Sequence, residues 1–381
     1  MQKYQCEEYG VWLGDAMLAE MMDSITKPAL VAIARGKGLM IKQSLRKAEF
    51  IEQLSTELLR PDMLRRYLFW MPGVDMYNLL CALGLDGRRL EKYLGEEVRD
   101  SKMGNWFCDT SYARYLEMDE DDDYLIELPC DLVAVLRTLL DEEFLVQYEQ
   151  YLWLQNVLMM GIALYQLIPR DIFLQLLEQW PGCRLSEEDA LKAIEMQPFD
   201  MDERYMIWGE YIVSSLASPE RYSLFLRKGN ESYYIPPEED IRHHVFDTEA
   251  AHPIIQGLMR KMTAKWGNLK TNGILDILFM ISMTMMLDVS EQKIRELLDK
   301  AFEKNGAVEV LWLDVQDYIR SLRPYTRRAC NHGFSDHELR EREKAAHRAR
   351  KAAQKAVAKK DNVISIDEQR RKRKKHKKAR R

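Results

Sequence analysis

Apolar residues recur three and four positions apart along most of the chain, which is the spacing that places them on one face of a helix. Two such stripes lie close together near the N-terminus. They consist of Leu30, Ile33 and Ala34, and then of Leu45, Phe50, Ile51, Leu54 and Leu58. Thr26 and Ser44 are suitable caps for the two helix starts, while Gly36 and Gly38 can adopt the left-handed backbone that ends a helix. The pattern predicts two short helices joined by a brief extended link.

The same segment, SITKPALVAIARGKGLMIKQSLRKAEFIEQL, carries three sequence features of a known module. These are a capped T-K-x-x-L opening, an I-A-x-x-x-G-L helix end, and S-L-R-K-A-E-F-I-E at the start of the second helix. With them, residues 24–59 resemble the helix-extended-helix module at the N-terminus of transcription terminator Rho, which is similar in turn to SAP motifs. The resemblance implies nucleic acid as the ligand, contacted by Lys37, Lys42, Arg46 and Lys47. Basic side chains beside a helix N-terminus are compatible with a phosphate.

The resemblance covers 36 of the 381 residues and does not extend to the rest of Rho. The sequence has no G-x-x-x-x-G-K-[ST] segment, which would form the phosphate-binding loop of an ATPase. It also shows no succession of short strands for an adjoining RNA-binding OB barrel. ATP-driven termination is therefore not implied, and docking of a protein by the module stays open as the alternative.

A strand–turn–strand–helix order appears twice in the middle of the chain. The strands are expected at 112–118 and 124–128 in the first copy and at 222–227 and 232–235 in the second. Pro129 and Pro237, which precede the two following helices, lie 108 residues apart. Several short helices precede each hairpin, and three helices followed by a two-stranded wing is the layout of a winged helix.

In a winged helix, the third helix would face the major groove of DNA. The first copy carries the basic residues Arg88, Arg89 and Lys92 in that helix. The second begins with the acidic run Glu187 to Asp189, which suits the helix dipole but repels phosphate. We therefore expect the second copy to be structural or to bind a protein.

Only 18 glycines and 12 prolines interrupt a chain rich in Leu, Met and Glu, so helix should dominate. We expect a mainly α, multi-helix fold with two small β-hairpins, arranged as tandem winged-helix-like units, and a disordered basic C-terminal tail. The expected segments are an N-terminal stretch (1–23), the Rho N-terminal-like module (24–59), winged-helix-like units (60–147 and 148–248), a helical segment (249–325), and a charged helix with the basic tail (326–381).

The net charge of −5 averages two very different parts of the chain. Residues 337–381 carry 19 Lys or Arg and 6 Asp or Glu, a balance of +13, so the remaining 336 residues carry −18. The tail ends with ten basic side chains in twelve residues, and such a segment binds phosphates by releasing counterions. These are Arg370, Arg371, Lys372, Arg373, Lys374, Lys375, Lys377, Lys378, Arg380 and Arg381. The alternatives are a solubilising tail, attraction to the protein's own acidic body, or attraction to an anionic membrane surface.

Reactive groups show no pattern typical of a catalytic or metal site. The six cysteines include no C-x-x-C pair, and none of the seven histidines has a metal-ligand spacing. The most apolar stretch, residues 274–287, is shorter than the roughly 20 residues of a membrane span. No secretory signal is visible at the N-terminus. We expect a cytoplasmic, non-catalytic protein without metal, cofactor or membrane span.

Two functions remain open at this stage. The first is a nucleic-acid-associated accessory or regulatory protein that contacts the phosphates of DNA or RNA through the basic tail and the Rho N-terminal-like module. The second is an interaction scaffold that binds a protein partner through its acidic helical body.

Overall fold

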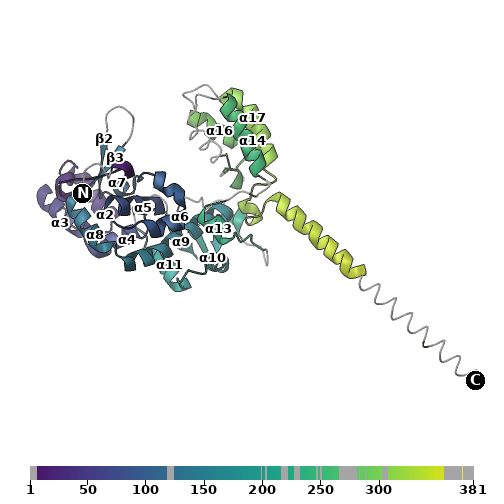
Figure 1. Ribbon diagram of the computed structural model, residues 1–381, viewed down its shortest axis with the longest axis horizontal. Coiled ribbons are helices and arrows are strands. Elements are labelled where there is room, and N and C mark those ends of the chain that lie inside the picture. The colour runs from purple at the N-terminus through teal and green to yellow at the C-terminus, as the bar shows by residue number, and fades with distance from the viewer. Residues whose placement is uncertain are drawn as a thin grey trace, which may run out of the picture. The chain divides into compact units, whose positions relative to one another are not determined.

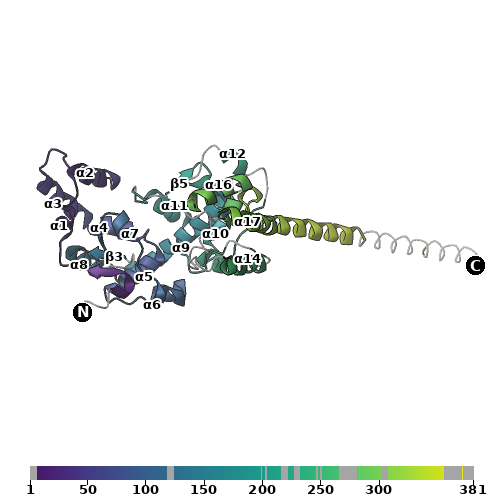
Figure 2. The ribbon, with the colours of Figure 1, turned by 90° about the horizontal axis from the view of Figure 1, so that it is seen from above.

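The computed structural model describes residues 7–117, 124–198, 200–201, 204–215, 222–226, 232–245, 248, 251–265, 281–282, 284–287, 289–302, 308–355 and 371. The chain divides into two compact units, residues 1–246 and 247–381, and each is described by itself (Figures 1 and 2). Helices dominate both units, and two small three-stranded sheets lie in the first. The predicted mainly α fold with small β elements is confirmed, and the predicted C-terminal tail lies outside the described residues apart from Arg371.

The first half of unit 1 consists of short helices packed around one hydrophobic core (Figure 1). They are α1 (Leu18–Met22), α2 (Lys27–Gly36), α3 (Lys47–Leu58), α4 (Pro61–Leu68), α5 (Gly73–Ala82), α6 (Arg88–Leu94), α7 (Trp106–Asp109) and α8 (Cys130–Leu139). The apolar faces of α2 and α3 join this core, which continues to Leu152. Residues 24–59 are therefore part of a larger packed body, and the predicted domain boundary at 59 is wrong.

The two predicted module helices are present as α2 and α3. Thr26 precedes α2, and Gly38 follows it with a positive φ of 72°. The predicted cap of the second helix is wrong, because α3 begins at Lys47 with Arg46 at its N-cap position. The carboxylate of Glu49 accepts a hydrogen bond of 2.9 Å from the Arg46 backbone N–H, which satisfies the helix start without Ser44.

The first sheet has the strand order β1-β3-β2. The hairpin β2 (Arg114–Glu117) and β3 (Tyr124–Leu128) confirms the first predicted pair of strands, and its predicted turn at 119–123 lies outside the described residues. The additional strand β1 (Val11–Leu13) pairs in parallel with β3. The N-terminal stretch, predicted as a separate segment, thus belongs to the same body.

Helix α9 (Glu142–Tyr165) crosses the predicted boundary at 147/148. It starts at Asp141, whose side chain accepts a hydrogen bond of 2.8 Å from the Phe144 N–H, and then runs for 24 residues. Most of its length is buried, because both halves of unit 1 pack against it. The proposed division of residues 60–248 at position 147 is therefore wrong.

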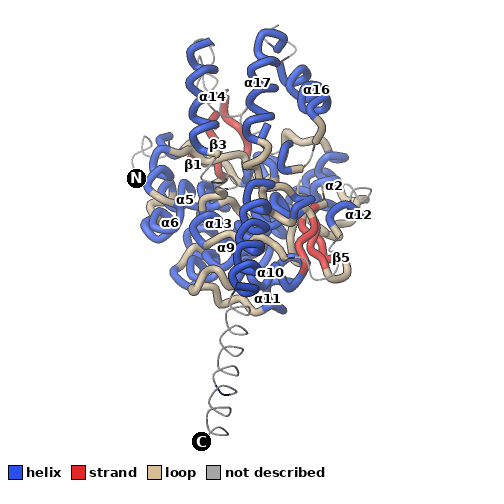
Figure 3. The backbone as a smooth tube through the Cα atoms, turned by 90° about the vertical axis from the view of Figure 1, so that its right-hand side faces the viewer, coloured by secondary structure: helices blue, strands red, loops and turns tan. Residues whose placement is uncertain are grey.

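The second half of unit 1 has the predicted winged-helix layout, with its hairpin in a different place. After α9 come β4 (Leu167–Pro169), α10 (Arg170–Leu177), α11 (Glu187–Glu195), β5 (Tyr205–Trp208) and β6 (Tyr211–Ser214). All pairs in this sheet are antiparallel, in the order β4-β6-β5 (Figure 3). The two-residue loop of the β5–β6 hairpin has Gly209 at a positive φ of 58°.

The strands predicted at 222–227 and 232–235 are wrong. Residues 222–225 form the short helix α12 (Tyr222–Phe225), and residues 232–237 form no strand. Tyr222, Phe225 and Tyr233 are all buried, so their aromatic character reflects packing and not a pleated ladder. The helix predicted from Glu238 is confirmed as α13 (Glu238–Arg242).

Unit 2 contains α14 (His252–Lys265), α16 (Glu291–Phe302), α17 (Val308–Leu322) and a helix at residues 336–355, which we call the C-terminal helix. A small core that includes Ile294, Val315 and Ile319 holds the first three together. The division of the chain at 246 lies close to the predicted boundary at 248. The predicted boundary at 325 is wrong, because Thr326, Arg327, Ala329, Phe334 and Ser335, which follow it, are buried in unit 2.

Candidate nucleic-acid interface

The C-terminal helix is firmly attached at its base. Ser335 and Glu338 form a reciprocal cap, in which the Ser335 N–H donates to Glu338 over 2.8 Å and the Glu338 N–H donates to Ser335 over 3.1 Å. Arg327 pairs with Glu338 at 3.2 Å, and Arg328 pairs with Asp336. These contacts hold the first turn of the helix to the packed part of unit 2.

Beyond its first turn, the C-terminal helix is exposed on every side. All residues from Arg340 to Lys355 are exposed (Figure 1). Lys344, Arg348, Lys351 and Lys355 follow one another at intervals of four, three and four residues, so at about 100° per residue they lie within roughly 60° of one another around the helix. We call these four side chains the basic stripe.

The other charged residues of the C-terminal helix are unevenly distributed along it. Glu338, Glu341 and Glu343 lie in its first half, where Glu341 pairs with Lys344 of the stripe at 2.8 Å, whereas residues 344–355 contain no acidic side chain. Arg348, Lys351 and Lys355 therefore make up the part of the stripe that lies away from carboxylates. The face opposite the basic stripe holds Ala346, Ala349 and Ala353 together with Arg342. A helix with a row of exposed cations and no carboxylate beside most of it can approach a phosphate backbone closely.

The charge pattern predicts a helix here, but none of the residues of this helix is among the predicted contacts. The available signal was the four-three-four spacing of Lys and Arg, which is hidden by the many alanines and glutamates around it. The predicted tail contacts, Arg370 and residues 372–381, lie outside the described residues. Arg371 is described as helical and exposed.

Lys37 cannot contact a phosphate, because its side chain is completely buried within unit 1. Its Nζ lies 2.9 Å from Asp200 Oδ2 and 3.8 Å from the ring centre of Tyr67, with the ring of Tyr112 at 4.7 Å. Tyr67 also donates a hydrogen bond to Asp200. Burial lowers the pKa of Lys37 to about 8, against the opposing effect of Asp200. This prediction is wrong: Lys37 joins α2 to the segment that contains Asp200.

Lys42, Arg46 and Lys47, the other three predicted contacts of the module, differ in how freely a ligand can reach their charges. Lys42 and Arg46 are exposed, so both can meet a ligand. Lys47 pairs with Asp23 at 3.5 Å and donates a hydrogen bond to the Asp23 backbone carbonyl. The positive charge of Lys47 is therefore partly compensated within the module. The module thus presents two available cations where the resemblance implies four.

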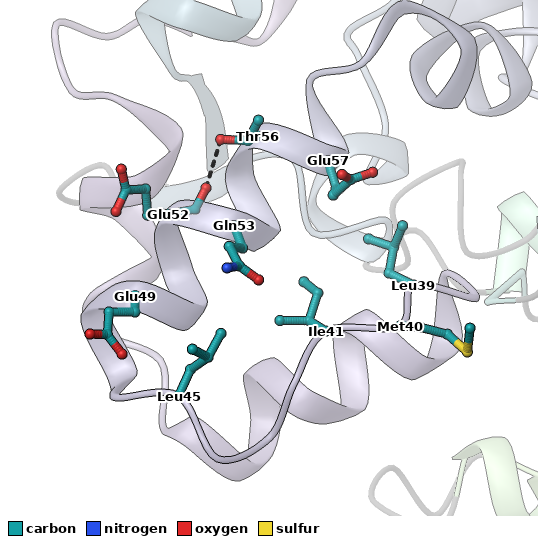
Figure 4. Close-up of a pocket in the computed structure, with 9 residues that line it drawn as sticks. All are labelled: Leu39, Met40, Ile41, Leu45, Glu49, Glu52, Gln53, Thr56 and Glu57. Atoms are coloured by element: carbon teal, nitrogen blue, oxygen red, sulfur yellow. Dashed lines mark hydrogen bonds between the residues drawn. The ribbon is translucent and has the colours of Figure 1, made fainter.

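An acidic groove runs along α3 beside the link from α2 (Figure 4). Its volume is about 620 Å³. The residues that line it are Leu39, Met40, Ile41, Leu45, Glu49, Glu52, Gln53, Thr56 and Glu57. We call this feature the α3 groove. Three carboxylates and no Lys or Arg line it, so it repels phosphate, and the surface of the predicted module is divided between opposite charges.

The basic residues predicted for the first winged-helix-like unit are largely paired. Arg88 binds Asp86 in a two-pronged ion pair, and Arg89 binds Glu149 and Glu142. Because their carboxylate partners cancel most of the field, α6 has little attraction for a phosphate backbone. Lys92 is exposed.

The described residues were also searched for a metal site and for a membrane-spanning helix. Among the described residues, no group of three His, Cys, Asp or Glu side chains lies close enough together to hold a metal ion. Searching the same residues for a helix with the length and hydrophobicity of a membrane span finds none.

No protein-family model matches the chain, and no curated protein or solved structure is significantly similar to it. The resemblance to the Rho N-terminal module therefore stays a prediction.

Proposed function

We propose that this chain is a cytoplasmic, non-catalytic accessory protein that associates with nucleic acid through its C-terminal region. The observation that supports the proposal is the basic stripe, which combines full exposure with a fixed attachment at the base of its helix. Lys344 to Lys355 span about 16 Å at 1.5 Å per residue, so the stripe can follow several successive phosphates. The ten basic residues at positions 370–381 add to the same charge.

The likeness of residues 24–59 to the Rho module supports a second, weaker contact at Lys42 and Arg46. Both are exposed, and they belong to the start of the second helix to which the resemblance points. The surrounding surface carries the carboxylates of the α3 groove. We therefore assign most of the phosphate contact to the C-terminal region and less to the module.

The test is fluorescence anisotropy of the full-length chain with duplex DNA and single-stranded RNA of about 20 nucleotides, at about 50 to 200 mM salt. The stripe variant carries Lys344→Gln, Arg348→Gln, Lys351→Gln and Lys355→Gln. On duplex DNA, loss of four phosphate contacts should weaken binding at least about tenfold and flatten the plot of log affinity against log salt by up to about 3 to 4.

The matched control removes four exposed cations from unit 1, at Lys92, Arg137, Arg184 and Lys192. It changes the net charge by the same amount and should leave most of the binding intact. Equal losses in the two variants would mean that only total charge matters and would contradict the assignment to the stripe. An intact chain that binds neither DNA nor RNA at low salt would refute the function itself.

A second candidate function is an interaction scaffold, as expected from the acidic character of the first 336 residues. The α3 groove favours this candidate, because it combines apolar side chains with carboxylates at one exposed place. The basic stripe and the α3 groove belong to different units of the chain, so these two contacts are compatible, whereas Lys42 and Arg46 lie in the link beside the groove.

A further inference from the structure

The link from α2 to α3 carries four apolar residues, of which Leu39, Ile41 and Leu45 pack in part against the core of unit 1 and Met40 does not. Met40 is completely exposed, and the next most exposed large hydrophobic side chain among the described residues is Met196 at 51%. Leu39, Ile41 and Leu45 flank Met40 and are only partly buried. A fully exposed methionine beside partly exposed apolar side chains is a feature of surfaces that meet a partner. We call these four side chains the apolar strip, although the exposed residues Lys42, Gln43 and Ser44 separate Ile41 from Leu45.

The opposite wall of the α3 groove is acidic. Glu49, Glu52 and Glu57 of α3 line the groove together with Gln53 and Thr56. In Figure 4 Gln53 points toward the link, whereas Glu49 and Glu52 lie at the outer side of α3 and Glu57 lies near Leu39. Glu57 pairs with Arg60, and Glu49 accepts the hydrogen bond that caps α3. For the exposed carboxylate of Glu52, no ion pair or hydrogen bond with a described residue is recorded. The wall thus offers at least one uncompensated negative charge beside the apolar strip.

The backbone of the link is also open. The Leu39 N–H donates to the Ala34 carbonyl over 2.8 Å, and the next hydrogen bond that a link N–H makes within the described residues comes from Leu45. The intervening N–H groups of Met40, Ile41 and Gln43 are left for water or for the carbonyl groups of another chain. An unpaired backbone beside side-chain pockets is a recurring mode of peptide recognition.

From these three observations we propose that the α3 groove binds a basic, partly apolar peptide segment of another protein. Apolar side chains of that segment would cover Met40, Ile41 and Leu45, while its Lys or Arg side chains would pair with Glu52 and its neighbours. Nucleic acid is the wrong ligand for this groove, because the carboxylates repel phosphate. A chain with basic residues alone would leave the apolar strip exposed. This site is separate from the basic stripe; it rests on the second candidate function, the interaction scaffold, and not on the association with nucleic acid.

The test uses the full-length chain and a fluorescent synthetic peptide of about 16 residues, made of Leu and Lys with Leu three and four positions apart. We expect saturable binding by anisotropy, and no binding of the same peptide with Glu in place of Lys. In a sample with ¹³C-labelled methionine methyl groups, the Met40 signal should shift on binding, whereas that of the exposed Met159 should not.

Two variants separate the groove from the general acidity of the chain. Glu52→Lys together with Met40→Ser should weaken peptide binding at least about tenfold, which is a loss of about 1.4 kcal/mol. The control, Glu195→Lys together with Met159→Ser, makes the same changes at exposed positions of α11 and α9 and should change binding less than about threefold. Glu52→Gln should have an intermediate effect.

Equal weakening by the two double variants would overturn the proposal, since the peptide would then respond only to net charge. Absence of binding to the intact chain, or binding without a shift of the Met40 methyl signal, would also overturn it. The stripe variant should bind the peptide like the intact chain. Failure of the proposed nucleic-acid function is therefore distinguishable from failure of this site.

Discussion

The buried ion pair of Lys37 and Asp200 makes the stability of unit 1 depend on pH in an unusual direction. Burial lowers the pKa of Lys37 from 10.5 to about 8. The unfolded chain therefore holds more protons than the folded chain between these pH values, and stability must rise with pH across this range. At about 1.36 kcal/mol per pKa unit, the burial of protonated Lys37 costs about 3 kcal/mol at pH 7. About 2 kcal/mol of this cost should be recovered by pH 9.5.

Asp200→Asn should cost about 2 to 3 kcal/mol at pH 7. Without its carboxylate partner, Lys37 is forced toward the neutral form, which adds at most about 1.5 kcal/mol because the pKa is already low. The altered hydrogen bonds with Lys37 and Tyr67 add about 1 kcal/mol. At pH 9.5 Lys37 is largely neutral in both proteins, so only the hydrogen-bond part, about 1 kcal/mol, should remain.

Lys37→Met is the matched counterpart and should be nearly neutral at pH 7, within about 1 kcal/mol. Asp200 is 20% exposed and keeps the hydrogen bond from Tyr67, so its carboxylate is not stranded when the lysine is removed. This variant should also lose the rise in stability between pH 7 and about 9.5. The two variants differ in cost at pH 7 because Lys37 is completely buried, whereas Asp200 is 20% exposed.

The assay is urea unfolding followed by tryptophan fluorescence, since six of the eight tryptophans lie in residues 1–246. Measurements stop at about pH 9.5, because burial raises the pKa of Tyr67 and Tyr112 and the ionisation of tyrosine in the unfolded chain opposes folding at higher pH. The reasoning is refuted if Lys37→Met keeps the pH dependence of the intact chain. It is also refuted if Asp200→Asn costs as much at pH 9.5 as at pH 7.

Three further predictions concern the helices and hairpin of unit 1. Gly161→Ala should lower the free energy of unfolding by about 1 to 3 kcal/mol, because a Cβ atom there would lie 2.6 Å from Ile168 Cδ1 in the buried face of α9; unchanged urea denaturation would show that this contact relaxes freely. Asp141→Ala should cost about 1 kcal/mol by removing the cap of α9, whereas Asp141→Ser should cost little, and equal losses in urea denaturation would argue against capping. Gly209→Ala should destabilise the β5–β6 hairpin by about 1 kcal/mol through its positive φ although there is space for the methyl group, and Gly209→Asn should cost less; faster amide exchange in β5 and β6 for the alanine variant is the expected result.

The elements best predicted from the sequence are those whose periodicity is strong and local. The apolar residues spaced three and four apart in α2 and α3 correctly predicted both helices, because one face of each helix is apolar and the other is charged. The start of α3 was predicted at Ser44, because serine is a common N-cap residue, but the helix begins at Lys47. The carboxylate of Glu49 accepts the hydrogen bond from the Arg46 N–H instead. A carboxylate three residues into the helix is the signal that could have corrected it.

The second hairpin shows the limit of a strand prediction from aromatic content. Residues 205–214 read YMIWGEYIVS, with a glycine at the turn between two runs of strand-forming residues, which is a stronger hairpin signal than residues 222–235. The tyrosines at 222 and 233 are buried by packing between elements, which no local pattern reveals. The burial of Lys37 is the same kind of case, because its partner lies 163 residues away.

The C-terminal helix also sets a distance. From Ser335, where the helix is capped, to Lys355 there are 20 residues, or about 30 Å of rigid rise. This is close to one turn of B-DNA, about 34 Å. Lys355 therefore lies that far along the helix from the packed part of unit 2, and the helix is long enough to serve as a spacer as well as a row of charges. Insertion or deletion of one helical turn would move that point by about 5 Å and, because 3.6 residues complete a turn, would keep its direction nearly unchanged.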